Sequence, residues 1–155
     1  MTKIETVSIV HSPPRVLLGM KKVRFGNGKY NGFGGRLENG ETLEECAIRE
    51  TFEECGIRII NPKRLGKILF HFESEEPDHL VYFFKANQFI GMPRESEEMK
   101  PEWFDETLIP YDRMWDADKH WIPIFLQDKI FKGYVEFNLR NMIKHYELNE
   151  VEILD

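Results

Sequence analysis

Glu50, Glu53 and Glu54 stand close together in a short acidic stretch that follows Arg49. On a helix, where successive residues turn by about 100°, the three side chains share one edge. Like charges three and four positions apart repel each other, and Glu54 falls beside the apolar side, where water is scarce. The arrangement is unfavourable unless a cation lies between the carboxylates. Mg²⁺ suits this edge, because it binds through a few carboxylates together with the phosphates of a substrate.

The other acidic residues of this stretch have a simpler interpretation. Most charge runs form a solvated face, and we interpret Glu38, Glu44 and Glu45 in this way. The metal-binding interpretation of the three later glutamates gains support from the pair Gly34-Gly35, which can turn tightly and bring a carbonyl close to a ligand. An ordinary turn remains compatible with the same two glycines.

The acidic stretch carries its own helix signals. Thr42 followed by Glu45 is a capping box, and Gly56 stands where a left-handed C-terminal residue is favoured, so a helix is predicted over 43–55. Arg49 within it can pair with Glu41 or with Glu53. The residues predicted to face the core are Leu43, Ala47, Ile48, Thr51, Phe52 and Cys55.

The rest of the chain predicts strands and one further helix. Segments 3–10, 15–20, 64–73 and 79–89 are rich in β-branched and aromatic residues and are separated by turn residues, with hairpin connections at 11–15 and 74–78. Helical spacing predicts a second helix over 118–129. The tail contains short extended stretches without an assigned register. These elements indicate a mixed α+β sandwich.

Composition limits the class of protein. The chain has 155 residues and a mass of 18.4 kDa, which suits one domain over residues 1–155. The net charge of −6 argues against binding of a nucleic-acid polymer. We find neither a long apolar run nor a signal peptide, and therefore expect a cytoplasmic protein with no membrane partner. We also expect a monomer. Cys46 and Cys55 are expected to be reduced.

The pattern from Gly35 to Ile57 resembles the Nudix box, G-x5-E-x7-R-E-x-x-E-E-x-G followed by an aliphatic residue. Segments outside the box, among them Arg15 to Lys22, Asn31 to Gly35 and Glu97 to Phe104, are similar to Nudix hydrolases that act on oxidised purine nucleoside triphosphates. The resemblance covers nearly the whole chain. It implies the Nudix fold, an α/β/α sandwich with a mixed central β-sheet, a Mg²⁺ cofactor with Mn²⁺ as a substitute, and a small-molecule nucleoside triphosphate as partner.

The resemblance also implies site residues by position. The metal and catalytic set is Gly34, through its carbonyl, with Glu50, Glu53, Glu54 and Glu98. Glu50 is the candidate base. Gly35, Lys21 and Arg36 would lie near the phosphates. The residues implied to line a purine pocket are Thr6, Asn31, Phe70, Phe72, Trp115 and Asp118.

Each pocket residue also has a structural interpretation. Phe70 and Phe72 would be core residues of an amphipathic strand, and Trp115 would fill the sandwich. Asp118 would be the N-cap of the second helix, and Asn31 would be a turn residue beside Gly32. Both interpretations stay open from sequence alone.

Two positions depart from the family pattern. Thr51 replaces an aliphatic residue of the box, and its methyl group can still pack. Ala117 replaces an aspartate that, in the similar enzymes, precedes the one matched by Asp118. Two adjacent carboxyl groups titrate as a pair, so one donates while the other accepts. We therefore expect a narrower or altered base preference here, unless Asp116 substitutes.

The sequence thus predicts Mg²⁺-dependent hydrolysis of an oxidised or otherwise modified purine nucleoside triphosphate to monophosphate and pyrophosphate. One alternative is a Nudix hydrolase of another nucleotide, including 2-hydroxy-dATP, methylated purine nucleotides or another nucleoside diphosphate derivative. A further alternative is a nucleotide-binding module that has lost turnover.

Overall fold

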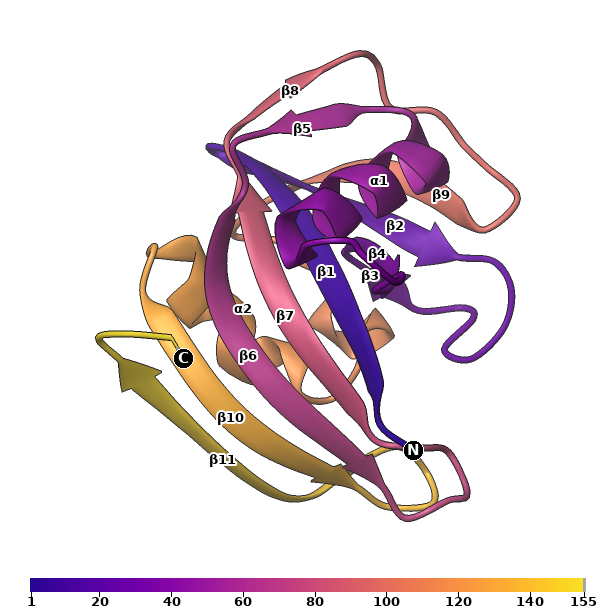
Figure 1. Cartoon of the computed structure of the whole chain (residues 1–155), viewed down its shortest axis with the longest axis vertical. Helices are drawn as coiled ribbons and strands as arrows, with labels where there is room; N and C mark the ends of the chain where they lie inside the picture. Colours follow the sequence, from indigo (N-terminus) through magenta and orange to yellow (C-terminus); the bar gives the residue numbers. More distant parts are fainter. Residues whose placement is uncertain (155) are drawn as a thin grey trace.

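The computed structural model describes residues 1–154 as a curved β-sheet with one α-helix on each face (Figure 1). The strands are β1 (Lys3–Ser12), β2 (Arg15–Lys21), β3 (Tyr30–Asn31), β4 (Phe33–Arg36), β5 (Arg58–Ile60), β6 (Lys63–Phe72), β7 (His79–Ala86), β8 (Gln88–Ile90), β9 (Met99–Asp105), β10 (Ile130–Phe137) and β11 (Ile143–Val151). The helices are α1 (Leu43–Cys55) and α2 (Asp118–Leu126), with a 3-10 turn at Tyr111–Arg113.

The large sheet is mixed. Its strand order is β11-β10-β6-β7-β1-β2-β3, while β4 also pairs with β1 and β9 also pairs with β2. Strand β1 runs parallel to β7, and β6 runs parallel to β10; the other pairs are antiparallel. The antiparallel pairs β1–β2 and β6–β7 confirm both predicted hairpins. A small second sheet joins β5 to β8.

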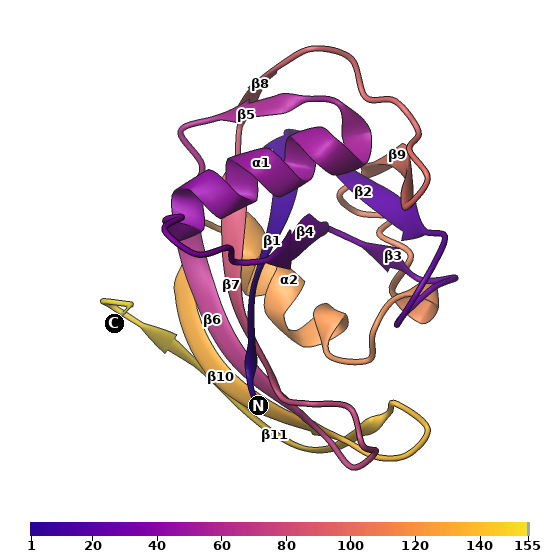
Figure 2. The same ribbon diagram turned by 45° about the vertical axis from the view of Figure 1, so that its right-hand side comes forward.

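The two faces of the sheet carry separate cores. Alternate residues of β1 point to opposite faces, so Ile9 packs with Trp121 and Phe125 on the α2 side, while Val10 packs with Ala47 and Cys55 on the α1 side. Figure 1 shows α1 in front of the sheet and α2 behind it, and Figure 2 shows the sheet curving around α2. The predicted α/β/α sandwich is confirmed.

Several predicted boundaries need correction. The segment 79–89 is not one strand: β7 ends at Ala86, and β8 pairs with β5 in the small sheet. Asn87 separates them, with its side-chain amide donating to the His11 carbonyl at 2.9 Å. Helix α2 ends at Leu126, before the predicted 129, because Asp128 adopts a left-handed φ of 60°. The unassigned tail forms the hairpin β10–β11.

The inward face of α1 also differs from the prediction, because it includes Cys46 and does not include Phe52. Phe52 is 50% exposed, and Glu54 and Cys46 are buried beside Ala47 and Thr51. The helix is therefore turned so that a carboxylate enters the protein interior. Both cysteines are free thiols, as expected. Within residues 1–154, helices α1 and α2 are too short or too polar to cross a membrane.

Candidate active site

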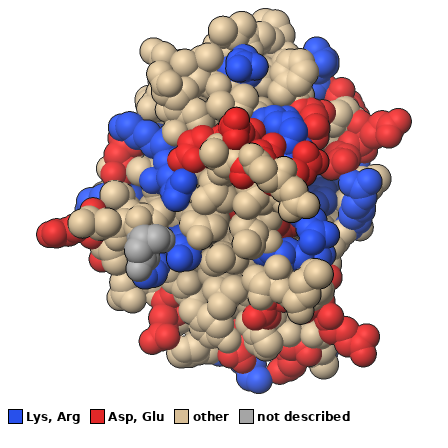
Figure 3. Space-filling view, in the orientation of Figure 1, with Lys and Arg blue, Asp and Glu red and all other residues tan. Residues whose placement is uncertain are grey.

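Helix α1 begins and ends where its local signals predict. The Thr42 hydroxyl accepts a hydrogen bond from the Glu45 N–H at 3.0 Å, and the Glu45 side chain accepts one from the Thr42 N–H at 2.8 Å. Gly56 adopts a left-handed φ of 78° at the other end. Acidic and basic side chains gather at the level of α1 on the face shown in Figure 3. We call Glu50, Glu53 and Glu54 of this helix, together with Glu98, the carboxylate edge.

Glu54 is the buried member of the carboxylate edge. Its side chain accepts a hydrogen bond from the Gly34 backbone N–H at 2.8 Å, and only 5% of the residue is exposed. Burial raises the pKa of Glu54 to about 8; the Gly34 N–H opposes this, and the charges of Glu50 and Glu98 add to it. A carboxyl group in these surroundings gains strongly from a cation.

Gly34 and Gly35 allow β4 to pass close to its neighbours. A Cβ on Gly34 would lie 1.7 Å from the Thr6 carbonyl oxygen, and one on Gly35 would lie 2.4 Å from Glu50 Oε2. Any side chain at Gly35 would therefore displace the Glu50 carboxylate. The glycine pair is needed for close approach, which is more than an ordinary turn requires.

Arg49 holds three carboxylates at once. Its guanidinium binds Glu41 through Nε at 2.6 Å and through a second nitrogen at 3.0 Å, Glu50 at 2.6 Å and Glu53 at 3.2 Å. It also donates to the Arg36 carbonyl at 3.1 Å. Both pairings predicted for Arg49 are present, and the contact with Glu50 is an addition. Burial raises the pKa of Glu50 above its ordinary value, although Arg49 opposes the rise.

Glu98 precedes β9 and completes the edge from another part of the chain. Its carboxylate binds Arg24 at 2.9 Å, and its charge raises the pKa of both Glu50 and Glu54. Across residues 1–154, no three His, Cys, Asp or Glu side chains are gathered closely enough to hold a metal ion. Arg49 holds Glu50 and Glu53 in this arrangement, and Arg24 holds Glu98. The carboxylate oxygens of the edge are nevertheless the kind of ligand that a hard divalent ion prefers, and such an ion would stabilise the charge of the buried Glu54.

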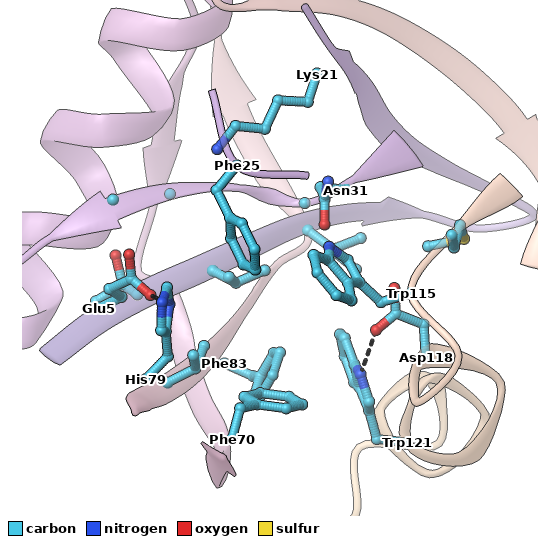
Figure 4. A pocket seen from close by; sticks show the side chains of 18 of the residues that line it. Glu5, Lys21, Phe25, Asn31, Phe70, His79, Phe83, Trp115, Asp118 and Trp121 are labelled. Carbon is cyan, nitrogen blue, oxygen red and sulfur yellow. Dashed lines mark hydrogen bonds and ion pairs between the residues drawn. The ribbon is translucent and has the colours of Figure 1, made fainter. Parts of the chain in front are cut away.

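An aromatic pocket lies next to the carboxylate edge. Phe72 is at its centre, with ring centroids 5.3 Å from Phe25, 5.4 Å from Phe137 and 6.0 Å from Trp115. Phe70 stacks on Phe137 at 5.8 Å. Figure 4 shows Phe25, Phe70 and Trp115 around the space. Phe70 and Phe72 belong to the core, as their structural interpretation predicts, and they also line the pocket.

Most of the predicted polar residues line the pocket, but Arg36 does not. Thr6, Lys21 and Asn31 line the pocket, and Gly34 and Gly35 lie at the end where Glu54 reaches it. The Thr6 hydroxyl lies 3.4 Å from Cys46 Sγ. Arg36 does not line the pocket; its exposed side chain lies at the end of β4.

Asp118 lines the pocket and is not an N-cap. Ala117 occupies the cap position, without a side-chain hydrogen bond, and Asp118 is the first residue of α2. The Asp118 carboxyl group accepts a hydrogen bond from Trp121 Nε1 at 2.9 Å (Figure 4). Burial raises the pKa of Asp118 to about 7, against the effect of that hydrogen bond. This side chain can therefore be neutral near physiological pH, where it both donates and accepts.

The neighbours of Asp118 do not supply a second pocket carboxylate. Asp116 accepts a hydrogen bond from the Ile143 N–H at 2.9 Å and binds Lys119 at 2.6 Å. Ala117 is buried in the core and borders a small separate cavity between α2 and the β10–β11 hairpin. Asp118 thus faces the pocket without the adjacent partner.

Sequence reasoning missed several lining residues, including Glu5, Phe25, His79, Trp121 and Phe137. The alternation of side chains along a strand could have predicted two of these residues, Glu5 and His79. Glu5 has the same parity as Val7 on β1, and His79 the same parity as Val81 on β7, and all four line the pocket. The parallel pairing of β1 with β7, which brings the two strands together, is not visible in the sequence.

Comparison with known proteins identifies the family. The NUDIX domain family matches residues 2–125, and the chain belongs to this family of hydrolases. A Danio rerio protein named oxidized purine nucleoside triphosphate hydrolase is 45% identical over 99% of this chain and 98% of its own length. The Mus musculus protein of the same name is 42% identical over 97% of each chain. The crystal structure of a mutator MutT protein from Bacillus halodurans superposes with a TM-score of 0.86 at 28% identity, covering 95% of this chain and 97% of the other.

Proposed function

We propose that this Nudix hydrolase converts oxidised purine nucleoside triphosphates of the 8-oxo-dGTP type into monophosphate and pyrophosphate, and so removes them from the nucleotide pool. One observation carries the proposal: a single pocket is lined both by Glu54 and Gly34, from the carboxylate edge and its glycine pair, and by Trp115 and Asp118. A nucleotide has the matching polarity, with a phosphate chain at one end and a flat base at the other. The names of the two most similar relatives described above agree with this substrate class.

We propose Mg²⁺ as the cofactor, with Mn²⁺ as a substitute. The groups that would hold it are the Gly34 carbonyl and the side chains of Glu50, Glu53, Glu54 and Glu98. When bound, such an ion polarises the bridging phosphates and neutralises their charge. The buried Glu54 supports the assignment, because a carboxylate there gains strongly from a cation.

The side chains around the ion would orient the reacting groups and transfer protons. Glu50 is the proposed base: it would accept a proton from the attacking water, and its raised pKa brings it closer to the working pH. Arg49 holds Glu50 in place at 2.6 Å. Lys21, at the phosphate end of the pocket, would balance developing negative charge, and Arg36 would do so from the exposed end of β4.

The aromatic pocket would select the base. Stacking against Trp115 and Phe72 favours any flat ring, whereas hydrogen bonds to the base edge separate one purine from another. Asn31 and Asp118 are the proposed edge readers. Thr6 would act closer to the phosphates, because its hydroxyl lies against α1, near Cys46.

A substrate panel tests the proposal. We expect the highest kcat/KM with an oxidised purine triphosphate, dependence on a divalent cation, and pyrophosphate as the second product. The panel contains 8-oxo-dGTP, 2-hydroxy-dATP, methylated purine triphosphates and the canonical nucleotides. A preference for 2-hydroxy-dATP or a methylated purine would instead assign the protein as a Nudix hydrolase of that modified purine nucleotide. The absence of a second carboxyl group beside Asp118 favours this alternative. Release of single phosphate, or no turnover at high enzyme concentration, would refute the proposal.

We further propose that residues 1–155 act as one domain, as a monomer and in the cytoplasm. Support for a single unit comes from the large sheet, which joins strands from both ends of the chain in one hydrogen-bonded path from β11 to β3. Size-exclusion chromatography with light scattering tests the oligomeric state, and a mass of twice 18.4 kDa would contradict it.

A further inference from the structure

A chain of alternating charges crosses β1 and β7 beside the aromatic pocket. His79 Nδ1 lies 2.5 Å from Glu5 Oε1, and His79 Nε2 lies 2.6 Å from Glu76 Oε2. Lys3 extends the chain by binding the same oxygen of Glu76 at 3.1 Å. We call Glu5, His79 and Glu76 the charged wall. None of the three belongs to the Nudix box or to the carboxylate edge.

The hydrogen bonds fix the protonation of the charged wall. A carboxylate only accepts, so each ring nitrogen of His79 must donate, and a ring with two donors is an imidazolium. Burial lowers the pKa of His79, but the hydrogen bonds and charges of Glu5 and Glu76 outweigh it and raise the pKa above its ordinary value. Both ring N–H groups of His79 therefore donate to glutamates, and neither is free to donate to a ligand.

Only part of the charged wall faces the pocket. Glu5 and His79 line it, whereas Glu76 lies behind His79 and does not. The His79 ring packs 5.3 Å from Phe72 and 5.8 Å from Phe25, so it extends the aromatic surface. Figure 4 shows Glu5 and His79 on one side of the space and Asp118 with Trp121 on the other. The pocket therefore carries a carboxyl group on each of two opposite sides.

We propose that Glu5 is a specificity-determining residue, whose carboxylate, held by His79, accepts a hydrogen bond from an N–H or O–H group of the bound nucleoside. A carboxylate has room for about four hydrogen bonds, and the ring of His79 occupies one oxygen. An acceptor in a partly closed apolar space favours ligands that present a donor to it and disfavours those that do not. This proposal rests on the proposed function, because it concerns the same pocket.

Glu5 and Asp118 would have complementary tasks in the pocket. Burial raises the pKa of Asp118 to about 7, so near neutral pH that group can offer a proton as well as accept one. Glu5 can only accept while His79 is bound to it. The donor that meets Glu5 belongs either to the sugar, as a hydroxyl, or to the base, as an amino or ring N–H group.

Matched variants separate recognition from support of His79. Glu5→Met and Glu76→Met each remove one partner of the same imidazole with the same change of side chain, but only Glu5 lines the pocket. The sugar arm compares 8-oxo-GTP, 8-oxo-dGTP and the 2′,3′-dideoxy analogue. The base arm compares 8-oxo-dGTP with 8-oxo-dITP, which lacks the 2-amino group, and with dGTP, which lacks the N7–H. Thermal unfolding of both variants checks that the fold is kept.

We expect the wild-type protein to prefer the donor-bearing member of one arm, and Glu5→Met to lose about 10- to 100-fold of that kcat/KM ratio. Glu76→Met should keep the ratio. The arm that changes identifies the sugar or the base as the source of the donor. Ratios that stay constant in Glu5→Met, or that change equally in both variants, would overturn the proposal.

Failure of the proposed function gives a different result. A protein that hydrolyses none of these triphosphates would refute the activity, while calorimetric binding of the corresponding monophosphates, which needs no turnover, would still report on Glu5. Loss of the donor preference in binding by Glu5→Met alone would then support the specificity role. Equal binding by wild-type protein and Glu5→Met would overturn it.

Discussion

The carboxylate edge, which reaches the cavity through Glu54, and the aromatic pocket are built in different ways. Three of the four glutamates of the edge come from one helix, and Arg49 of the same helix holds two of them. The pocket takes its rings from β6, β7, β10, α2 and the loops before β3 and α2. Apart from Glu54, its polar side chains come from β1, β2, β3, β7 and α2. One region is a local device, and the other exists only after the whole sheet has formed.

This difference separates the two tasks of a nucleotide hydrolase. The phosphate end is the same in every nucleoside triphosphate, so a fixed helical motif suffices there. The base end must change when the substrate changes, and a pocket assembled from many elements can change one residue at a time. Ala117, which departs from the family pattern, is such a change in this chain. We therefore expect substitutions at the edge to abolish turnover and substitutions in the pocket to alter preference.

Glu54→Gln should produce the largest effect. The amide keeps the shape and the hydrogen bond from Gly34 but removes the charge, so kcat/KM should fall on the order of 100- to 10,000-fold. The free energy of unfolding of the variant should instead be higher than that of the wild-type protein. Burial raises the pKa of Glu54 to about 8, so wild-type protein loses free energy of unfolding as pH rises from the unfolded-state pKa towards 8. Glutamine avoids that loss.

The matched control for this prediction is Glu44→Gln. Glu44 lies on the same helix but binds Arg64 at 3.0 Å, away from the edge. Its replacement should leave kcat/KM unchanged. Steady-state kinetics and thermal unfolding at pH 8.5 measure both quantities; full activity in Glu54→Gln would remove the carboxylate edge from the mechanism.

The same difference explains what the sequence predicts well. Helix α1 matches its predicted range of 43–55, because Thr42, Glu45 and Gly56 act within a few residues of the helix ends. The prediction that Phe52 faces the core was wrong, because the helix instead buries Glu54, which the sequence placed only beside the apolar side. Strand β8 was missed because its pairing with β5 is a tertiary contact.

The pocket shows the limit of the sequence more clearly. Phe72, Trp115 and Asp118 follow from the family resemblance, and the structure gathers them in one place. Glu5 and His79 stand far apart in sequence and meet only through the parallel β1–β7 pairing. A short-range pattern contains no information about that pairing.

Trp115→Ala should weaken binding more than chemistry. The indole ring lies 5.3 Å from both Phe25 and Phe137, and the loss of one stacking surface costs on the order of 1–3 kcal/mol, or about 5- to 150-fold in KM. We expect kcat to stay within a few-fold. Trp103→Ala is the control, because Trp103 packs on Phe89 and Arg15 outside the pocket. Equal KM values in wild-type protein and Trp115→Ala would separate the ring from substrate binding.

Asp118→Asn should change the pH dependence of stability. The folded-state pKa of about 7 lies above the unfolded value, so the folded protein binds the extra proton between them. The full contribution of Asp118 to the free energy of unfolding is present below about pH 4. It decreases by up to about 1.4 kcal/mol per pH unit as the pH rises towards 7, and it does not change further above that pH. Asparagine removes this fall. Urea unfolding of both proteins at pH 5 and pH 8 measures it, and parallel curves would show that Asp118 does not titrate in this range.

Ala117→Asp should give the smallest change and the most specific one. It places a second carboxyl group next to Asp118, so that a shared proton can be donated or accepted according to the base edge. We expect the ratio of kcat/KM for 8-oxo-dGTP and 2-hydroxy-dATP to shift several-fold, up to about tenfold for 1.4 kcal/mol. Because Ala117 is buried, some loss of stability should accompany the shift. Lys119→Asp introduces the same side chain at an exposed position one residue beyond Asp118 and should leave the ratio unchanged. An unchanged ratio in a folded Ala117→Asp protein would show that the base preference does not depend on this pair, and would leave the opposite side of the pocket, where Glu5 lies, as the place to look for it.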